Sequence, residues 1–117
     1  MNYRALGNTG LQVSEIGLGC EGFAEDNCKE AKKLLDEAEK LGINYFDLYA
    51  SDPAVRSALG TALQGRRNKF FLQAHLCSVW KNGQYERTRK IDEVKQSFAD
   101  LLKRLATDHI DVGMIHY

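Results

Sequence analysis

Two kinds of apolar periodicity alternate along the chain, and this alternation limits the possible folds more than any other feature of the sequence. Short apolar runs, of the length of buried strands, are followed by stretches with the apolar spacing of an amphipathic helix. The runs predict strands at residues 16–19, 43–48, 69–76 and 110–115. The helical spacing predicts helices between them, over residues 27–41, 52–63 and 91–105.

Capping signals mark the ends of the first two predicted helices. Asn27 and Glu30 have the spacing of a capping box, and Gly42 follows the last apolar position. Asp52 and Pro53 have the identities of an N-cap and a proline in the first helical turn. We expect one buried face on each helix, formed by Ala31, Leu34, Leu35, Ala38 and Leu41 in the first and by Val55, Ala58, Leu59, Ala62 and Leu63 in the second.

Two segments lie outside this alternation. Residues 3–6 and 11–13 flank a glycine-bounded turn at 7–10 and predict a β-hairpin at the start of the chain. The polar stretch 78–90 predicts a long loop, a kind of segment that often carries function. Its aromatic residues, Trp80 and Tyr85, either line a substrate pocket or simply pack the loop.

Strands that alternate with helices predict an α/β fold with a parallel sheet, because strand–helix–strand units cross over in a right-handed sense. Two architectures have this order of elements. A doubly wound sheet has helices on both faces and can be complete at 117 residues. A TIM (β/α)₈ barrel takes roughly 250 residues, so in that case the chain supplies the N-terminal half of the domain.

Charge and cysteine content exclude several classes of protein. The 16 basic and 16 acidic residues balance, so we expect no nucleic-acid surface. The sequence has neither the long apolar run of a membrane span nor the apolar core of a signal peptide, and we expect no membrane contact and a cytoplasmic protein. The three cysteines contain no C-x-x-C pair, which predicts reduced thiols and supports neither a metal site nor an iron–sulfur cluster.

Residues 17–22 satisfy the G-x-G-x-x-G pattern of a Rossmann-like dinucleotide-binding domain, with Asp47 at the end of the next predicted strand as the ribose acid. That mechanism needs the third glycine to open a helix, so that the helix N-terminus meets the pyrophosphate. The capping box at Asn27 starts the helix more than a turn later. We therefore keep the Rossmann interpretation only as an alternative.

Several segments in order resemble one known family. They are the opening hairpin and first strand from residue 3 to 19, the second strand at 42–47, the following helix at 55–63, and the third helix and fourth strand at 98–105 and 108–116. In these segments the chain resembles the aldo-keto reductases over essentially its whole length. The resemblance implies the first half of a TIM barrel, with the hairpin of residues 1–14 closing its bottom and residues 15–117 forming the barrel units.

The resemblance also implies an oxidoreductase that uses NADP(H) to interconvert a small-molecule carbonyl and an alcohol. It places cofactor contacts at Gly19, Cys20 and Asp47. Because barrels usually build their phosphate site after strands 7 and 8, we expect these 117 residues alone to bind NADPH weakly and to be inactive.

The family's catalytic tetrad carries over only in part. Asp47 matches its aspartate and His116 its histidine, but Asp52 stands at the place of the tyrosine and His75 at the place of the lysine. We prefer a helix-capping role for Asp52. His75 is a candidate partner of Asp47 across neighbouring strand ends, although imidazole lacks the permanent charge of lysine at pH 7. Tyr49 is a candidate for a displaced phenol.

Three alternatives remain open. Asp47, His75 and His116 have ligand chemistry, but their spacing does not support a metal site and we assign none. Without the Tyr–Lys pair, a barrel relative of this kind is also a candidate binding or interaction protein. Finally, a half-barrel would leave inner residues such as Tyr45, Leu72 and Met114 in water, so we expect the fragment to self-associate.

Overall fold

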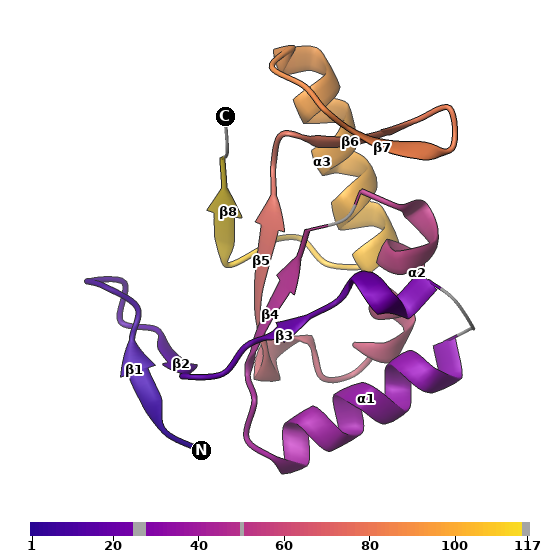
Figure 1. Cartoon of the computed structure of the whole chain (residues 1–117). Coiled ribbons are helices and arrows are strands. Elements are labelled where there is room, and N and C mark those ends of the chain that lie inside the picture. Colours follow the sequence, from indigo (N-terminus) through magenta and orange to yellow (C-terminus); the bar gives the residue numbers. More distant parts are fainter. Residues whose placement is uncertain (25–27, 50, 116–117) are drawn as a thin grey trace.

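The computed structural model describes residues 1–24, 28–49 and 51–115 and contains a four-stranded parallel sheet (Figure 1). Its strands follow one another in chain order: β3 (Leu18–Gly19), β4 (Tyr45–Leu48), β5 (Phe71–His75) and β8 (Val112–Met114). Helices connect them: α1 (Cys28–Lys40), α2 (Pro53–Ala62) and α3 (Ile91–Leu105), with short 3₁₀ turns η1 (Glu21–Ala24) and η2 (Arg67–Lys69). This order confirms the predicted alternation of strands and helices.

All three helices cover one face of the sheet (Figure 1). The strand residues beneath them alternate along β4 and β5, where Phe46, Leu48, Leu72 and Ala74 are buried in one hydrophobic core. A doubly wound fold would have helices on both faces and a reversal in strand order. The structure has neither feature over its described residues, so the barrel-half architecture is confirmed and the doubly wound alternative is wrong.

The side of the sheet opposite the helices corresponds to the inside of a barrel. Our expectation that Leu72 lies there is wrong, because Leu72 is buried in the core below the helices. Side chains alternate along a strand, so the residues of β5 on the open side are Phe71, Gln73 and His75. The same alternation that places His75 on the open side therefore places Leu72 under the helices.

The first helix buries a narrower stripe than its sequence pattern predicts. Ala31, Leu35 and Ala38 are buried, whereas Leu34 and Leu41 are 48% and 59% exposed. Leu34 lies one position from the centre of the stripe, which rotates it to the edge of the helix. Leu41 follows the last residue of α1 and belongs to the turn at Gly42, which has a φ of 77°. Asn27, the predicted cap, lies outside the described residues.

The predicted long loop at 78–90 contains a second β-hairpin instead. Strands β6 (Ser78–Lys81) and β7 (Gln84–Arg87) pair in antiparallel register around Asn82 and Gly83. Both turn residues have positive φ, 51° and 77°, the backbone of a two-residue type I′ turn. Asn-Gly is the strongest short sequence signal for such a turn, so the sequence held the information that the loop prediction missed.

The N-terminal hairpin is confirmed, with β1 (Tyr3–Ala5) paired to β2 (Gln12–Ser14). It is fastened to the segment before β4. The Asn44 side chain accepts from the Ser14 amide at 2.8 Å and donates to the Gln12 carbonyl at 2.9 Å. The Tyr3 hydroxyl donates to the Gly42 carbonyl at 2.9 Å. The hairpin therefore lies at the end of the sheet where β4 begins.

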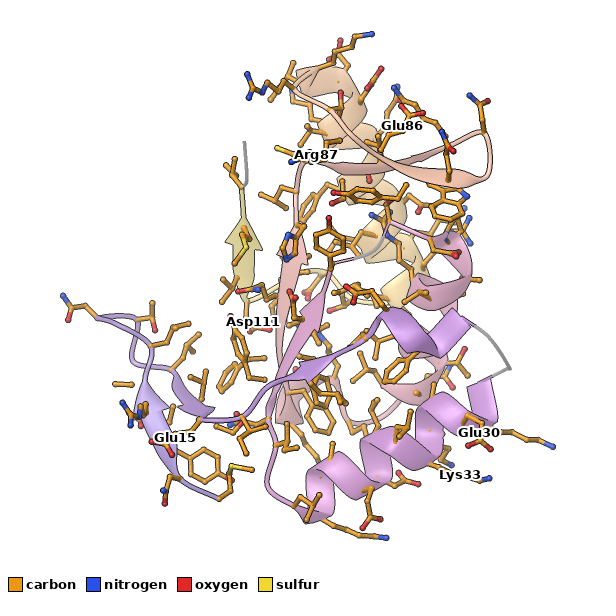
Figure 2. All side chains as sticks on the ribbon, in the orientation of Figure 1. Glu15, Glu30, Lys33, Glu86, Arg87 and Asp111 are labelled. Atoms are coloured by element: carbon orange, nitrogen blue, oxygen red, sulfur yellow. The ribbon has the colours of Figure 1, made fainter. Side chains whose placement is uncertain are left out.

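A guanidinium fixes this same end of the sheet. Arg67 Nη2 donates to Asp111 Oδ2 at 2.8 Å, and the same oxygen accepts from the Leu72 amide at 2.8 Å. Arg67 Nη1 also donates to the Phe70 carbonyl at 2.7 Å. Asp111 precedes β8, as Figure 2 shows. The polar side chains of the candidate site lie at the opposite end of the sheet, where the strands finish. Across the described part of the chain, we find no helix long and apolar enough to cross a bilayer.

Candidate active site

Polar side chains gather on the open face of the sheet at the carboxyl ends of β4 and β5. Asp47 lies directly opposite Gln73 in the parallel register, and His75 follows two residues later on the same face. Gln73 Nε2 donates to Asp47 Oδ1 at 2.8 Å, and His75 Nε2 lies 3.1 Å from the same oxygen. The expected proximity of His75 and Asp47 on one face is confirmed.

Two tyrosines close the side of this cluster that faces the β6–β7 hairpin. The ring of Tyr49 stands edge-on to His75, with 4.8 Å between ring centroids, and stacks on Tyr85 at 5.2 Å. The Tyr49 hydroxyl donates to the Tyr85 hydroxyl at 3.0 Å. The His75 side chain is consequently only 9% exposed, while Asp47 and Tyr49 are 37% and 36% exposed. Asp47 and Tyr49 are thus more exposed than His75, and a ligand can reach both.

Hydrogen bonding and burial shift the proton affinities around this cluster. The hydrogen bond to Tyr85 raises the pKa of Tyr49 above its ordinary value, with smaller contributions from burial and from the charge of Glu21. Burial and the nearby Asp47 charge raise the pKa of Tyr45 as well. Tyr45 and Tyr49 both keep their protons at neutral pH and act as hydrogen-bond donors.

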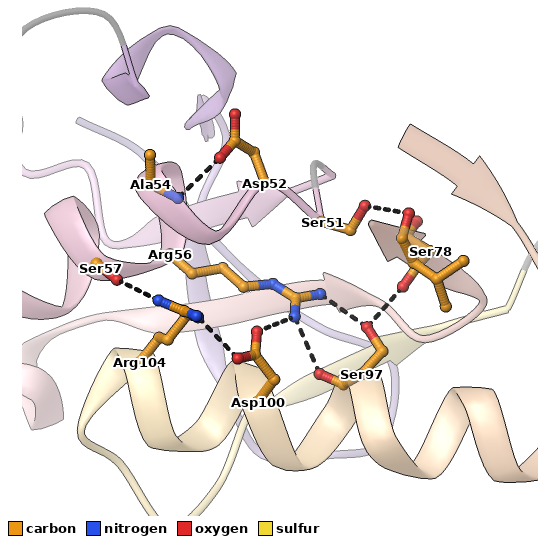
Figure 3. Close-up of polar contacts among 10 residues, drawn as sticks. Ser51, Asp52, Ala54, Arg56, Ser57, Ser78, Ser97, Asp100 and Arg104 are labelled. Carbon is orange, nitrogen blue, oxygen red and sulfur yellow. Dashed lines mark hydrogen bonds and ion pairs between the residues drawn. The ribbon is translucent and has the colours of Figure 1, made fainter. Parts of the chain in front are cut away.

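The β6–β7 hairpin that carries Tyr85 is held by a polar network between α2 and α3 (Figure 3). Arg56 is 4% exposed, and its guanidinium donates to the Ser97 carbonyl at 3.0 Å and to Asp100 at 2.9 Å. Ser97 Oγ in turn donates to the Ser78 carbonyl of β6 at 2.8 Å. A charge this deeply buried is stable only when it is paired and hydrogen-bonded, as here. Arg56 therefore sets the position of the strand that leads to Tyr85.

The remaining predicted site residues have different surroundings. Asp52 Oδ1 accepts from the Ala54 amide at 2.7 Å, which confirms the helix-capping interpretation. Gly19 pairs with Asp47 in the neighbouring strand and is exposed. The side chain of Cys20 is fully buried in the core, and its amide already donates to the Asp47 carbonyl at 3.0 Å. The Cys20 carbonyl accepts from the Phe23 amide at 3.3 Å, so both main-chain groups of Cys20 already have partners. His116 lies outside the described residues.

Sequence reasoning missed Gln73 and the contact between Tyr49 and Tyr85. Gln73 is two residues before His75 in a predicted strand, so the period of two places both on one face. The strand period was therefore a signal that could have identified Gln73. The contact between Tyr49 and Tyr85 joins residues 36 positions apart, and it depends on the hairpin that the loop prediction replaced.

The Rossmann and metal alternatives gain no support from the described residues. The third glycine of the pattern, Gly22, lies in the 3₁₀ turn η1 rather than at the start of α1. Within residues 1–24, 28–49 and 51–115, no three His, Cys, Asp or Glu side chains come together as a metal site. The proposed triad with His116 cannot be placed within these ranges.

Known proteins share both the sequence and the arrangement of strands. Residues 15–117 match the aldo/keto reductase family. An oxidoreductase of Bacillus subtilis, YqkF, is 36% identical over 99% of this chain, and the L-galactose dehydrogenase of Arabidopsis thaliana is 36% identical over 97%. The chain spans 39% and 37% of the lengths of these two relatives.

A solved structure agrees with these matches. The holo form of the aldo-keto reductase AKR11C1 from Bacillus halodurans superposes with a TM-score of 0.86 at 33% identity, covering 99% of this chain and 40% of that chain. With the strand order, the one-sided helices and the polar strand ends already established, the match is one of both sequence and fold. The chain belongs to the aldo/keto reductase family.

Proposed function

We propose that the chain provides one wall of an NADP(H)-dependent oxidoreductase site that interconverts a carbonyl and an alcohol. The observation that carries this proposal is the group at the strand ends, where His75 Nε2 lies 3.1 Å from Asp47 Oδ1 and the ring of Tyr49 covers His75. Active sites of β/α barrels lie at this end of the strands. Asp47 also stands where the family has its catalytic aspartate.

The residues present fit the nicotinamide part of the cofactor. When bound, a nicotinamide supplies the hydride for carbonyl reduction. Gly19 lies beside Asp47 on the adjacent strand, and a side-chain carbon at that position would meet no other atom within 4 Å. Gly19 thus leaves open space next to the polar cluster. The adenine-side phosphate site of barrels is usually built after strands 7 and 8, so the residues of this chain would hold only the nicotinamide end of the cofactor.

Reduction also requires a proton at the carbonyl oxygen, and Tyr49 is placed to give one. Its phenol is partly exposed beside His75, and to protonate a substrate it would turn its O–H from the Tyr85 hydroxyl to the carbonyl oxygen, with Tyr85 then donating to Tyr49. A positive charge next to a phenol favours its ionised form, so a protonated His75 would ease the loss of that proton. Asp47 accepts the His75 N–H at 3.1 Å and so holds the imidazole in place beside Tyr49. His75 would then replace the lysine of the family.

We further propose a small polar carbonyl or alcohol as substrate. The Arabidopsis relative is named as a dehydrogenase of L-galactose, a sugar. Two groups of the cluster that a ligand can reach are the Asp47 carboxylate and the Tyr49 phenol, and both form hydrogen bonds with hydroxyl groups.

Substitutions in the whole protein that carries this chain test the proposal. NADPH oxidation is measured with a panel of small aldehydes, hydroxyketones and sugars. We expect Tyr49→Phe and His75→Ala each to lower kcat by about 100-fold or more, the usual effect of removing an acid–base group. His109→Ala is the matched control, because His109 precedes β8 at the opposite end of the sheet and should leave kcat unchanged. Full activity of Tyr49→Phe would refute the assignment of the proton donor.

A second candidate function is binding or interaction without catalysis. It is favoured by the capping role of Asp52 and by His75, which together replace the Tyr–Lys pair of the family. The double variant Asp52→Tyr with His75→Lys separates the two candidates. A reductase scaffold should keep or gain carbonyl reduction in this variant, whereas a binding protein should reduce no aldehyde in either form.

A further inference from the structure

A continuous chain of hydrogen bonds crosses the open face of the sheet below the candidate site. It begins at Tyr45, whose hydroxyl lies 2.6 Å from Gln73 Oε1. It continues from Gln73 Nε2 to Asp47 Oδ1 at 2.8 Å and ends at His75 Nε2, 3.1 Å from the same oxygen. Nothing in the proposed reaction uses Tyr45 or Gln73, although both lie next to the groups that it does use.

The chemistry of these groups fixes the direction of every bond. An ionised carboxylate only accepts hydrogen bonds, so the Gln73 atom facing Asp47 is the amide nitrogen. The amide oxygen then faces Tyr45, and the phenol has to donate. For the same reason His75 carries a hydrogen on Nε2, and a second proton on the imidazole has to bind at Nδ1.

Strand register explains why the chain forms at this place. Tyr45 and Asp47 lie two residues apart on β4, and Gln73 is directly opposite Asp47 on β5. Alternation of side chains puts Gln73 and His75 on the same face of β5. Because four side chains project from two rigid neighbouring strands, their spacing changes little without a change in the sheet itself.

We propose that Gln73 and Tyr45 are positioning residues that fix the Asp47 carboxylate and, through it, the tautomer and charge of His75. Tyr45 orients the amide of Gln73, and Gln73 shares Oδ1 of Asp47 with His75. The N–H group of Gln73 stabilises the negative charge on Asp47 Oδ1, so that this charge attracts the imidazole of His75 less strongly. The effect on the reaction rests on the proposed function, but the effect on His75 does not.

Other charged and titratable groups surround this cluster and have to be kept constant in the test. They come from each packed element: Cys20 after β3, Tyr49 after β4, Glu21 in η1, and Tyr85 and Arg87 on β7. None of them is altered by a substitution at position 45 or 73.

Nitrogen NMR of the His75 imidazole, recorded as a function of pH, tests the proposal directly. In Gln73→Leu, Asp47 loses one of its two donors, so its charge attracts the imidazolium more strongly. We expect the titration midpoint of His75 to move to higher pH. Tyr45→Phe should move it in the same direction by less, because the amide of Gln73 is still present but no longer oriented. Gln64→Leu, at an exposed position after α2, is the matched control and should leave the midpoint unchanged.

An unchanged His75 midpoint in a folded Gln73→Leu protein would overturn the proposal. If Gln73→Leu does not fold, Tyr45→Phe decides it, because that variant removes a single hydroxyl. In the whole protein, at a pH low enough to protonate His75 in both forms, we expect Gln73→Leu to lower kcat about fivefold, the effect of one hydrogen bond, with little change in KM, because the Asp47 carboxylate is no longer held in place. A parent protein without reductase activity would refute the proposed function and leave the NMR result to decide the positioning roles.

Discussion

At the scale of single residues, burial separates two of the three cysteines, Cys20 and Cys77. Cys20 is fully buried, and burial, with the nearby charge of Asp47, raises the pKa of its thiol to about 12. Cys77, after β5, is half-buried. Because the thiolate is the reactive form, we expect iodoacetamide at pH 8 to modify Cys77 in the native protein while Cys20 reacts only after unfolding. Peptide mass spectrometry measures this, with urea-denatured protein as the control. Equal rates at both cysteines in native protein would contradict the burial of Cys20.

Single residues also show which parts of the site the sequence could predict. The proximity of Asp47 and His75 is predictable because each ends a neighbouring parallel strand, and the carboxyl ends of such strands share one edge. The expectation for Leu72 is wrong because residues 72 and 75 of one strand point to opposite faces, so the strand that turns His75 to the open side turns Leu72 to the helices. Asp52 was interpreted correctly because capping is local and needs only the next residues of the chain.

At the scale of elements, α2 and α3 approach so closely that only glycine fits at one point of contact. A side-chain carbon at Gly60 would overlap the Arg104 carbonyl oxygen and lie 2.9 Å from Leu105 Cα. We expect Gly60→Ala to destabilise the protein by about 1–3 kcal/mol, the cost of overpacking. Gly22→Ala is the control, since a side-chain carbon there would meet nothing within 4 Å. Urea unfolding measures both, and a stabilising Gly60→Ala would mean that the helices are farther apart.

The β6–β7 hairpin is fastened to α3 through a carboxylate, which gives this contact a pH dependence. Glu93 accepts from Lys81 at 2.8 Å and from Thr88 at 2.5 Å, and these bonds lower its pKa from 4.5 to about 2. A lowered pKa in the folded state gives stability that is present above pH 4.5 and is lost as the pH falls toward 2. Glu93→Gln should therefore lower the urea midpoint most at neutral pH.

The difference between Glu93→Gln and the parent protein should shrink between pH 4.5 and 2. The matched control is Glu30→Gln, whose carboxylate pairs with exposed Lys33 on α1 (Figure 2). Exposed pairs of this kind contribute little, so its urea midpoint should remain near that of the parent at each pH. A difference for Glu93→Gln that is constant with pH would show that its carboxylate is not the fastening group.

The elements themselves were the most predictable level of this structure. Periods of two and 3.6 residues located the strands and helices because each buries one face. The hairpin at 78–87 is not located by these periods because, of its strand residues, only Ser78 and Val79 are buried and the others are partly or fully exposed. Only the Asn-Gly turn marks it.

At the scale of the whole molecule, the sheet ends at two strands that have one neighbour each. β3 and β8 are the outer strands of the four-stranded sheet. Apolar side chains flank both of them, with Ile16 and Ile115 each 60% exposed and Met114 37% exposed. Unpaired strand edges beside exposed apolar residues favour pairing with another chain. A parallel sheet is normally covered on both faces, whereas this one has helices on a single face.

We therefore expect these 117 residues to self-associate when produced alone. Sedimentation over micromolar concentrations should show a mass that rises above the 13.2 kDa of one chain. Ile115→Lys should lower this association, because a charged side chain beside an edge strand opposes pairing. Leu34→Lys is the matched control, since Leu34 is also exposed but lies on helix α1 rather than on or next to an edge strand. A single 13.2 kDa species at every concentration, folded and cooperative in urea, would show that the open face and edges are stable in water.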